Sequence, residues 1–277
     1  ISFATVLVCL ALSHDPVGAA TASCPLGSAA YPFSESSLPR YDVAIPDGGP
    51  GDPDEPPLEA RYYGATALFF QGAGGCTRPL ITAQGKGFRN CTPTDVDGMA
   101  RSMAAAVEDL LQRQDLRPVD LDLAGCWFTI PLPTEKYPRE YFEQIVADPA
   151  RHELNGEYAA RWILEHYDEE PVVNLHAAVL RLNPDLYVAF LCGEVCYEVK
   201  QVVQEVFPGQ QVLFVGYGDG TAYIPGDRML SEGGYEANLS TTEFRLPGKF
   251  RPGLNERFRQ GFAEARRRLG GQPSVQV

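Results

Sequence analysis

Side chains that can bind a metal ion or move a proton stand at the ends of apolar stretches in this sequence. His14 follows an apolar stretch at the start of the chain, and Glu194 follows the apolar residues 186–191. Tyr223 and Tyr235 come after a further apolar stretch and a glycine-rich turn. Zinc takes three or four His, Cys or carboxylate ligands, and α/β folds place such groups on loops that follow strands. A metal site is therefore one interpretation of these residues.

Each of these residues also has an ordinary structural interpretation. His14 can be a plain loop histidine, and Glu194 can be an acidic residue that complements the dipole at the start of a helix. Tyr223 and Tyr235 can be core aromatics. The two glycines directly before Tyr235 indicate a positive φ angle or a close backbone approach at that point. From these residues alone, the sequence predicts an α/β domain with a possible metal site.

A glycine-rich turn over residues 72–79 (GAGGCTRP) holds two further reactive side chains. Successive backbone N–H groups in such a turn can cradle an anion, and a plain connection after a strand is the alternative. Cys76 and Thr77 are candidate nucleophiles, although no histidine base is adjacent to them in the sequence. None of the cysteine spacings is a C-x-x-C pair, so a cysteine zinc site is not expected.

The elements that must position these residues follow from the hydrophobic pattern. Apolar stretches bounded by turn residues predict strands at 1–12, 65–71, 119–131, 171–182, 186–191 and 211–216. Asn183-Pro184-Asp185 between two of these stretches predicts a hairpin, and 119–131 is typical of an antiparallel or edge strand. Residues 22–60 are rich in Pro, Gly and acidic residues, which indicates a long surface loop.

Helical spacing of apolar residues predicts the remaining elements. Helices are expected at 94–114, at two places within 138–168 with a break near Asp148-Pro149, after Glu194 to about 206, and at 255–269. The second helix of the 138–168 pair is expected to bury Tyr158, Trp162, Ile163 and Tyr167. Strands mixed with helices in this order predict an α/β fold, a mixed β-sheet with flanking helices in a single domain.

Composition limits the classes of function. The chain has 277 residues and a formal net charge of −13, which argues against a nucleic-acid partner because phosphate binding needs clustered Lys and Arg. No segment reaches the roughly 18 apolar residues of a membrane span. Seven cysteines, with sequons at Asn90 and Asn238, predict a secreted or lumenal glycoprotein. Residues 1–12 can alternatively be the apolar part of a signal peptide with cleavage after Ala22.

The ordered set of motifs is more specific than any one of them. The order is LALSHDP, FFQGAGGCTRP, a strand that ends in GE, then GYGDGTAYIP and EGGYE. This order resembles the neutral/alkaline non-lysosomal ceramidase family, whose members are zinc-dependent amide hydrolases. The resemblance covers most of the chain and is best at residues 186–236. It implies that residues 1–277 are part of a ceramidase-like catalytic domain, incomplete at the N-terminus.

The resemblance also implies roles for individual residues. In the family, two histidines, a glutamate and a tyrosine bind zinc, and these motifs fall on His14, Glu194 and Tyr223. No residue matches the other histidine, which belongs to a segment further upstream. A second tyrosine that assists the oxyanion falls on Tyr235, twelve residues after Tyr223 as in the family.

The family's nucleophile turn is altered here. The family pattern is G-D-V-S-P, whereas this chain has Gly75-Cys76-Thr77-Arg78-Pro79, with Cys76 at the aspartate position and Arg78 at the serine position. An arginine cannot accept an acyl group. Cys76 or Thr77 replaces the serine, a water activated by zinc attacks directly, or amide cleavage is lost. Arg78 is a candidate clamp for a carboxylate or phosphate on the substrate.

The expected function is zinc-dependent hydrolysis of an N-acyl linkage in a sphingolipid or a related amide. The substrate is then a small amide or a lipid, which allows peripheral membrane contact, and no protein partner is implied. The first alternative is a degenerate, non-catalytic member of the same family that binds a lipid or a partner. The second alternative is an unrelated secreted α/β glycoprotein in which the motif order is a coincidence.

Overall fold

The described residues belong to two units. The computed structural model describes residues 70–85, 87–113, 119–149, 156–218 and 222–270. Residues 90–113 belong to one unit and the other described residues belong to a second, larger one, and we consider each unit by itself. The predictions for residues 1–12, 22–60 and 65–69 lie outside the described residues, and so does His14.

The smaller unit contributes one described helix, α2 (Pro93–Gln112), where the sequence predicts a helix at 94–114. Thr92 is the N-cap, so the helix begins one residue earlier than predicted. The Thr92 side chain accepts a hydrogen bond from the backbone N–H of Asp95, and Asp95 accepts one from the backbone N–H of Thr92. This reciprocal capping box, with Pro93 in the first turn, fixes the start of the helix.

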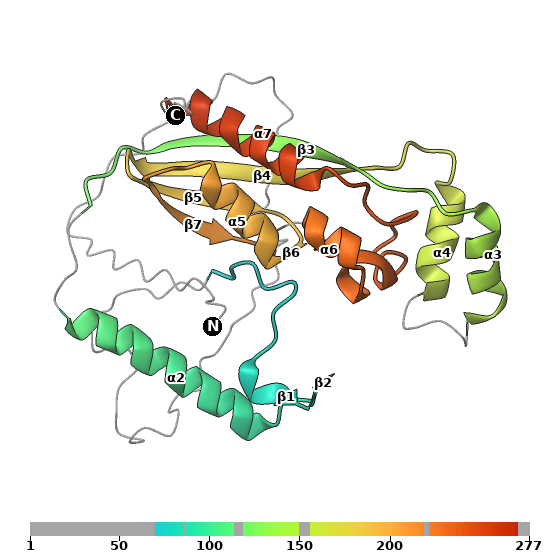
Figure 1. Ribbon diagram of the computed structural model, residues 1–277, viewed down its shortest axis with the longest axis horizontal. Helices are drawn as coiled ribbons and strands as arrows, with labels where there is room; N and C mark the ends of the chain where they lie inside the picture. Colours follow the sequence, from blue (N-terminus) through green and yellow to red (C-terminus); the bar gives the residue numbers. More distant parts are fainter. Residues whose placement is uncertain (1–69, 86, 114–118, 150–155, 219–221, 271–277) are drawn as a thin grey trace, which may run out of the picture. The chain divides into compact units, whose positions relative to one another are not determined.

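The larger unit is built on a mixed four-stranded sheet. Its strands are β3 (Ala124–Pro133), β4 (Val172–Asn183), β5 (Leu186–Leu191) and β7 (Gln211–Val215), in the order β3-β4-β5-β7. The β3–β4 and β4–β5 pairs are antiparallel and the β5–β7 pair is parallel. The mixed β-sheet that the sequence predicts is therefore confirmed, with β3 as an edge strand (Figure 1).

The predicted hairpin is the turn between β4 and β5. Asn183 Oδ1 accepts a hydrogen bond from the backbone N–H of Asp185 at 2.9 Å, which makes an Asx turn. The register shifts between Arg181 and Asn183, and this irregularity brings the strand into the turn.

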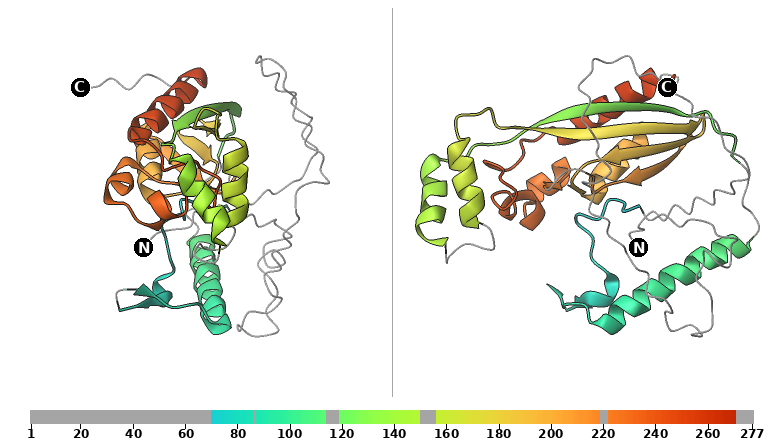
Figure 2. Two further views of the ribbon diagram at one scale, coloured as in Figure 1. Left: turned by 90° about the vertical axis from the view of Figure 1, so that its right-hand side faces the viewer. Right: turned by 180° about the vertical axis from the view of Figure 1, so that it is seen from behind.

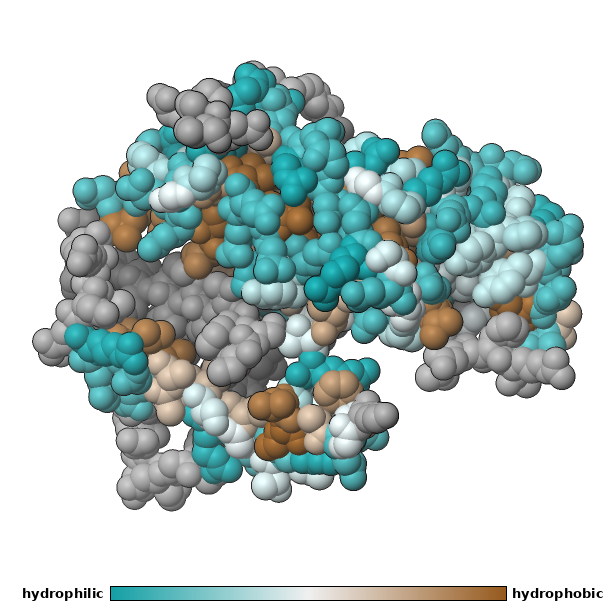
Figure 3. Space-filling model, in the orientation of Figure 1, coloured by the Kyte–Doolittle hydropathy of each residue, from teal (hydrophilic) through white to brown (hydrophobic). Residues whose placement is uncertain are grey.

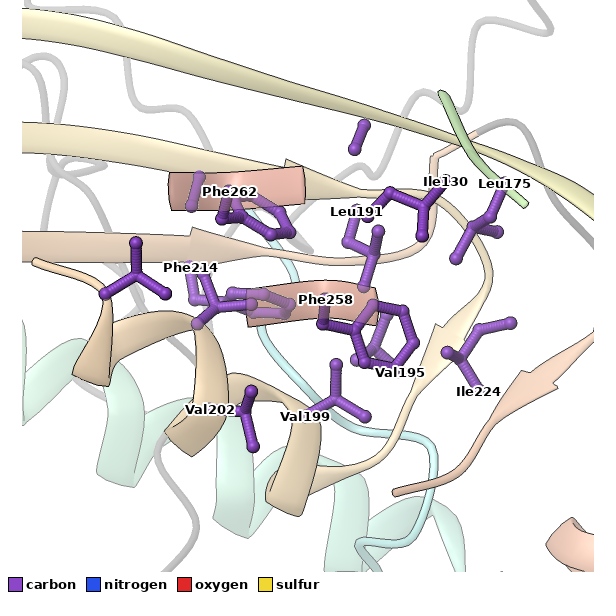
Figure 4. Close-up of a cluster of buried hydrophobic side chains, with 14 of the residues drawn as sticks. Ile130, Leu175, Leu191, Val195, Val199, Val202, Phe214, Ile224, Phe258 and Phe262 are labelled. Carbon is purple, nitrogen blue, oxygen red and sulfur yellow. The ribbon is translucent and has the colours of Figure 1, made fainter. Parts of the chain in front are cut away.

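Two helices cover one face of the sheet (Figures 1 and 2). They are α5 (Tyr197–Glu205) and α7 (Leu254–Arg268), and α7 buries Leu254, Phe258 and Phe262 at helical spacing. A Cβ atom on Gly261 would lie 3.1 Å from the Ile130 side chain, so α7 packs closely on β3. Figure 4 shows the resulting hydrophobic cluster, with side chains from the sheet, α5 and α7 in contact.

A helix pair forms a separate, smaller cluster. It consists of α3 (Arg139–Ala147) and α4 (Gly156–Glu165), and the predicted break falls at Asp148, directly after α3. Ile163 is buried as expected, whereas Trp162 and Tyr167 are half-buried. The prediction for Tyr158 is wrong, because its side chain is 60% exposed and the Arg245 guanidinium lies 5.0 Å from its ring centroid.

Short elements complete the larger unit. They are η1 (Leu80–Thr82), β1 (Ala83–Gln84), β2 (Gly87–Phe88), β6 (Glu194–Val195), β8 (Tyr223–Ile224), α6 (Asp227–Glu232) and a π-helical turn η3 (Tyr235–Leu239). Hydrophilic residues cover most of the surface over α5, α6 and α7 in the view of Figure 3. Within the part of the chain that the structure describes, no helix has the length and apolar character needed to cross a membrane.

Candidate functional site

The two-stranded β6–β8 pair positions the predicted metal ligands. Its strands are parallel, with Glu194 opposite Tyr223 and Val195 opposite Ile224. Val195 and Ile224 are fully buried in the main hydrophobic cluster, whereas Glu194 and Tyr223 are half-buried. Because successive side chains of a strand point to opposite faces, this register places Glu194 and Tyr223 side by side, away from the core. Glu194 therefore lies in a strand and not in the first turn of a helix.

Gly193 makes this short pairing possible. Its φ angle is +86°, and a Cβ atom there would lie 2.7 Å from the Ile224 side chain and 2.9 Å from the carbonyl oxygen of Ala222. The same carbonyl accepts the backbone N–H of Glu194 at 2.8 Å. Only glycine fits this position, which explains the Gly-Glu pair seen in the sequence.

Two tyrosine side chains lie near the Glu194 carboxylate. Burial raises the pKa of Tyr223 to about 12, and the nearby Glu194 charge and a hydrogen bond to Glu194 add to this effect. The pKa of Tyr217 is raised for the same reasons, with burial as the largest cause. Three oxygen-bearing side chains thus converge at one point. Sequence reasoning missed Tyr217, whose φ angle of +59° is uncommon for a residue other than glycine.

Tyr235, the predicted assisting tyrosine, lies next to Tyr223. The two ring centroids are 5.7 Å apart in an edge-to-face arrangement, and the Tyr235 hydroxyl donates a hydrogen bond to Glu243 at 3.1 Å. Gly233 and Gly234 have φ angles of +79° and +113°, so the predicted positive φ before Tyr235 is confirmed. Glu243 lies outside every motif of the sequence and was also missed.

The glycine-rich turn over residues 72–79 packs against β6. The backbone N–H of Gly75 donates to the carbonyl oxygen of Val195 at 2.9 Å, and Thr77 N–H donates to the Gly74 carbonyl at 2.9 Å. A Cβ atom on Gly75 would lie 2.2 Å from the Glu194 carbonyl oxygen, so a larger residue would displace the turn or the strand. The predicted tight turn is confirmed, and it lies beside the Glu194 backbone.

Cys76 extends from this turn to the start of α5. Its Sγ accepts a hydrogen bond from the backbone N–H of Tyr197 at 3.3 Å, and its side chain is exposed. A hydrogen bond from the Cys196 thiol, together with the Tyr197 N–H, lowers the pKa of Cys76 to about 6, although burial and Glu236 oppose the shift. Cys196 is fully buried, and its hydrogen bond to Cys76 raises its pKa. Sequence reasoning missed this pair of thiols, because the two residues are distant in the chain.

Arg78 is placed differently from the other candidates. Its side chain is exposed, and its guanidinium lies 5.6 Å from the ring centroid of Phe88 in β2. The structure thus gathers Glu194, Tyr223, Tyr235 and Cys76 around β6 and the residues that follow it, and it places Arg78 against the β1–β2 hairpin.

The residues at this site fit part of a zinc centre. Glu194 and Tyr223 are paired in the β6–β8 register and carry oxygen atoms, and zinc accepts oxygen ligands of this kind. Among the described residues, no three His, Cys, Asp or Glu side chains are grouped as a metal site would require. The other ligand predicted from the sequence, His14, lies outside the described residues.

Comparisons with known proteins found similarity at the level of structure. No protein-family model and no curated protein sequence matches the chain. The crystal structure of neutral ceramidase from Pseudomonas aeruginosa matches with a TM-score of 0.43 and 14% identity, over 77% of this chain and 39% of that one. A structure described as ceramidase complexed with C2 matches with a TM-score of 0.39 and 14% identity, over 66% of this chain and 36% of that one. The chain spans well under half the length of either protein.

Proposed function

We propose that this chain supplies part of the active site of a zinc-dependent amide hydrolase related to the neutral ceramidases. One observation carries the proposal: the parallel β6–β8 register sets Glu194 beside Tyr223. These are the two residues that the motif order marks as zinc ligands. Their pairing depends on a contact between distant segments, which neither motif contains by itself. The resemblance and the register therefore support the same site independently.

Glu194 and Tyr223 would hold the zinc ion, together with His14 and a histidine from an upstream segment. When bound, zinc lowers the pKa of a water molecule toward about 7 and polarises a carbonyl group. Tyr217, whose hydroxyl lies near the same carboxylate, would orient Glu194 in the way that outer hydrogen bonds commonly orient metal ligands.

Tyr235 is proposed as the group that stabilises the tetrahedral oxyanion. Its ring lies edge-to-face with Tyr223, and its hydroxyl donates a hydrogen bond to Glu243. A donor of this kind commonly contributes roughly 3 kcal/mol to transition-state stabilisation. Rotation of the hydroxyl hydrogen from Glu243 toward the substrate would supply that donor.

With the nucleophile turn altered, two groups are candidates for attack on the substrate carbonyl, and one side chain of the turn is a candidate contact for the substrate. Water is the first attacking group, and the Cys76 thiolate at the start of α5 is the second. The exposed Arg78 is proposed as a contact for an anionic part of the substrate. The substrate is proposed to be an N-acyl sphingolipid or a smaller amide, reached outside the cell or in a lumenal compartment.

A non-catalytic role in lipid binding is the second candidate. The observation that favours it is Arg78 at the position where the family has its serine nucleophile. A protein of this kind would keep the β6–β8 pair and bind an N-acyl lipid without cleaving it.

Hydrolysis of a short-chain fluorescent ceramide and of a panel of N-acyl amides, by the full-length protein with added zinc, tests the proposal. We expect turnover in the wild type and a loss on the order of a hundredfold or more in Glu194→Gln. The matched control is Glu232→Gln in α6, whose carboxylate pairs with Arg228 on the surface, and it should keep full activity. Binding of the lipid without turnover would favour the second candidate, and neither binding nor turnover would overturn both.

A further inference from the structure

We propose that Cys76 and Cys196 form a peroxide-reactive thiol pair that closes reversibly to a disulfide beside β6. The pair is made of an exposed thiol on the glycine-rich turn and a fully buried thiol at the N-cap of α5. This inference does not depend on amide hydrolysis, because it needs only the two sulfur atoms and their surroundings.

Backbone hydrogen bonds hold the two residues together. Gly75 N–H donates to the Val195 carbonyl at 2.9 Å, and Cys196 N–H donates to the Ile224 carbonyl at 2.9 Å. The turn that carries Cys76 is therefore attached to the strand that leads into Cys196. Tyr197 N–H, directly after Cys196 in the chain, donates to Cys76 Sγ at 3.3 Å, and the Cys196 thiol is near enough to Cys76 to shift its pKa.

Hydrogen-bond donors around the Cys76 sulfur favour its thiolate form. Its sulfur lies at the N-terminus of α5, where unpaired N–H groups and the helix dipole stabilise a negative charge. The charged or titratable groups that face it are Cys196, Tyr217 and Glu236, and Glu236 opposes ionisation. The Cys196 thiol is the largest cause of the shift and Tyr197 N–H adds to it, so that the pKa of Cys76 is lowered to about 6 although burial and Glu236 oppose this. Redox-sensing cysteines share this combination of exposure, low pKa and a neighbouring second thiol.

A peroxide is the oxidant that converts the two thiols to a disulfide. The Cys76 thiolate attacks one peroxide oxygen, so that an S–O bond forms, the O–O bond breaks and hydroxide leaves. Sulfur is oxidised to sulfenic acid and the peroxide is reduced. Cys196 then attacks the Cys76 sulfur: an S–S bond forms, the S–O bond breaks, and the Cys196 proton leaves with the hydroxide as water. A dithiol reductant restores both thiols.

The other described cysteines lack one or more of these features. Cys126 is buried in β3, and Cys192 is half-buried at the end of β5. Cys91 is exposed next to the start of α2, but Thr92 and Asp95 already cap that helix. Cys91 is therefore a suitable control. It is exposed, as Cys76 is, but the N-terminus of the helix beside it is already capped by other side chains.

Alkylation of the reduced, full-length protein tests the protonation state of Cys76. The rate of reaction with iodoacetamide is measured as a function of pH by mass spectrometry of the Cys76 peptide. This rate should rise with pH and reach half of its plateau value near pH 6. At pH 6 we expect Cys76 to react about tenfold faster than the thiol of an unstructured peptide, because its larger thiolate fraction outweighs its lower nucleophilicity. A half-plateau above pH 8 would overturn the proposal.

Oxidation tests the pairing itself. After stoichiometric hydrogen peroxide, the wild-type protein should yield a peptide pair linked through Cys76 and Cys196, which dithiothreitol separates. In Cys196→Ser, dimedone should instead trap a sulfenic acid on Cys76, and Cys91→Ser should behave as the wild type. The wild-type linkage remains decisive if Cys196→Ser does not fold. Linkage of Cys76 to any other cysteine, or oxidation of Cys91 before Cys76, would contradict the proposal.

Discussion

The four-stranded sheet and the β6–β8 pair hold their side chains in place by different means. Each strand of the sheet has five or more paired residues where it meets its neighbours, and α5 and α7 cover one face. The β6–β8 pair has two paired residues per strand. Val195 and Ile224 anchor this pair, because both side chains pack within the hydrophobic cluster of the sheet (Figure 4). The proposed function therefore rests on a short pairing that the larger core stabilises.

Removing a central core side chain gives the largest expected effect on both regions. Phe258→Ala should lower the free energy of unfolding by about 3–5 kcal/mol, because it leaves a cavity in the cluster that holds the sheet and Val195 together. Urea denaturation of the full-length protein measures this loss. Tyr158→Ala is the control, since Tyr158 is an exposed aromatic on α4. A loss equal to that of the control would show that Phe258 is not central to the fold.

Gly193→Ala tests the β6–β8 pair separately from the four-stranded sheet. A side chain there meets both a strained φ angle and a contact of 2.7 Å with Ile224, so it should cost about 1–3 kcal/mol and shift Glu194 relative to Tyr223. Gly209→Ala is a matched control, because Gly209 also has a positive φ angle, +75°, but has no neighbour within 4 Å among the described atoms. Equal destabilisation by the two variants would show that crowding at Gly193 has no part in the pairing.

Removal of the Asp227 carboxylate should have a smaller effect on stability. This carboxylate accepts backbone N–H groups of Gly253, Leu254 and Asn255 at 2.7, 3.0 and 3.1 Å, which caps α7 from the start of α6. Asp227→Ala should lower the free energy of unfolding by about 1–2 kcal/mol without changing the β6–β8 pair. Chemical denaturation measures the loss, and an unchanged midpoint would mean that solvent satisfies these N–H groups equally well.

Local signals explain why the sequence predicts most of the sheet and helices. The alternation in β3, the Asn183-Pro184-Asp185 turn and the helical spacing of Phe258 and Phe262 are all contained within short segments. The errors come from context. Tyr158 is on the exposed side of α4, where the hydrophobic pattern did not distinguish the two sides, and Thr92 caps α2 because Asp95 completes its capping box.

The candidate site was predictable in part. Glu194, Tyr223 and Tyr235 belong to motifs whose order is visible in the sequence, and the structure brings these three residues together. Tyr217 and Cys196 were missed because their roles depend on the close approach of distant segments. No local pattern encodes the hydrogen bond between Cys196 and Cys76, or the convergence of Tyr217 on Glu194.

Zinc content tests the central claim most directly. Elemental analysis of the full-length protein should find about one zinc ion per wild-type chain, since zinc sites of this class hold a single ion. Glu194→Gln and Tyr223→Phe should each lose most of it, and Glu232→Gln should retain it. Zinc retained in Glu194→Gln, or absent from a correctly folded wild-type protein, would contradict the assignment of the β6–β8 pair as a metal site.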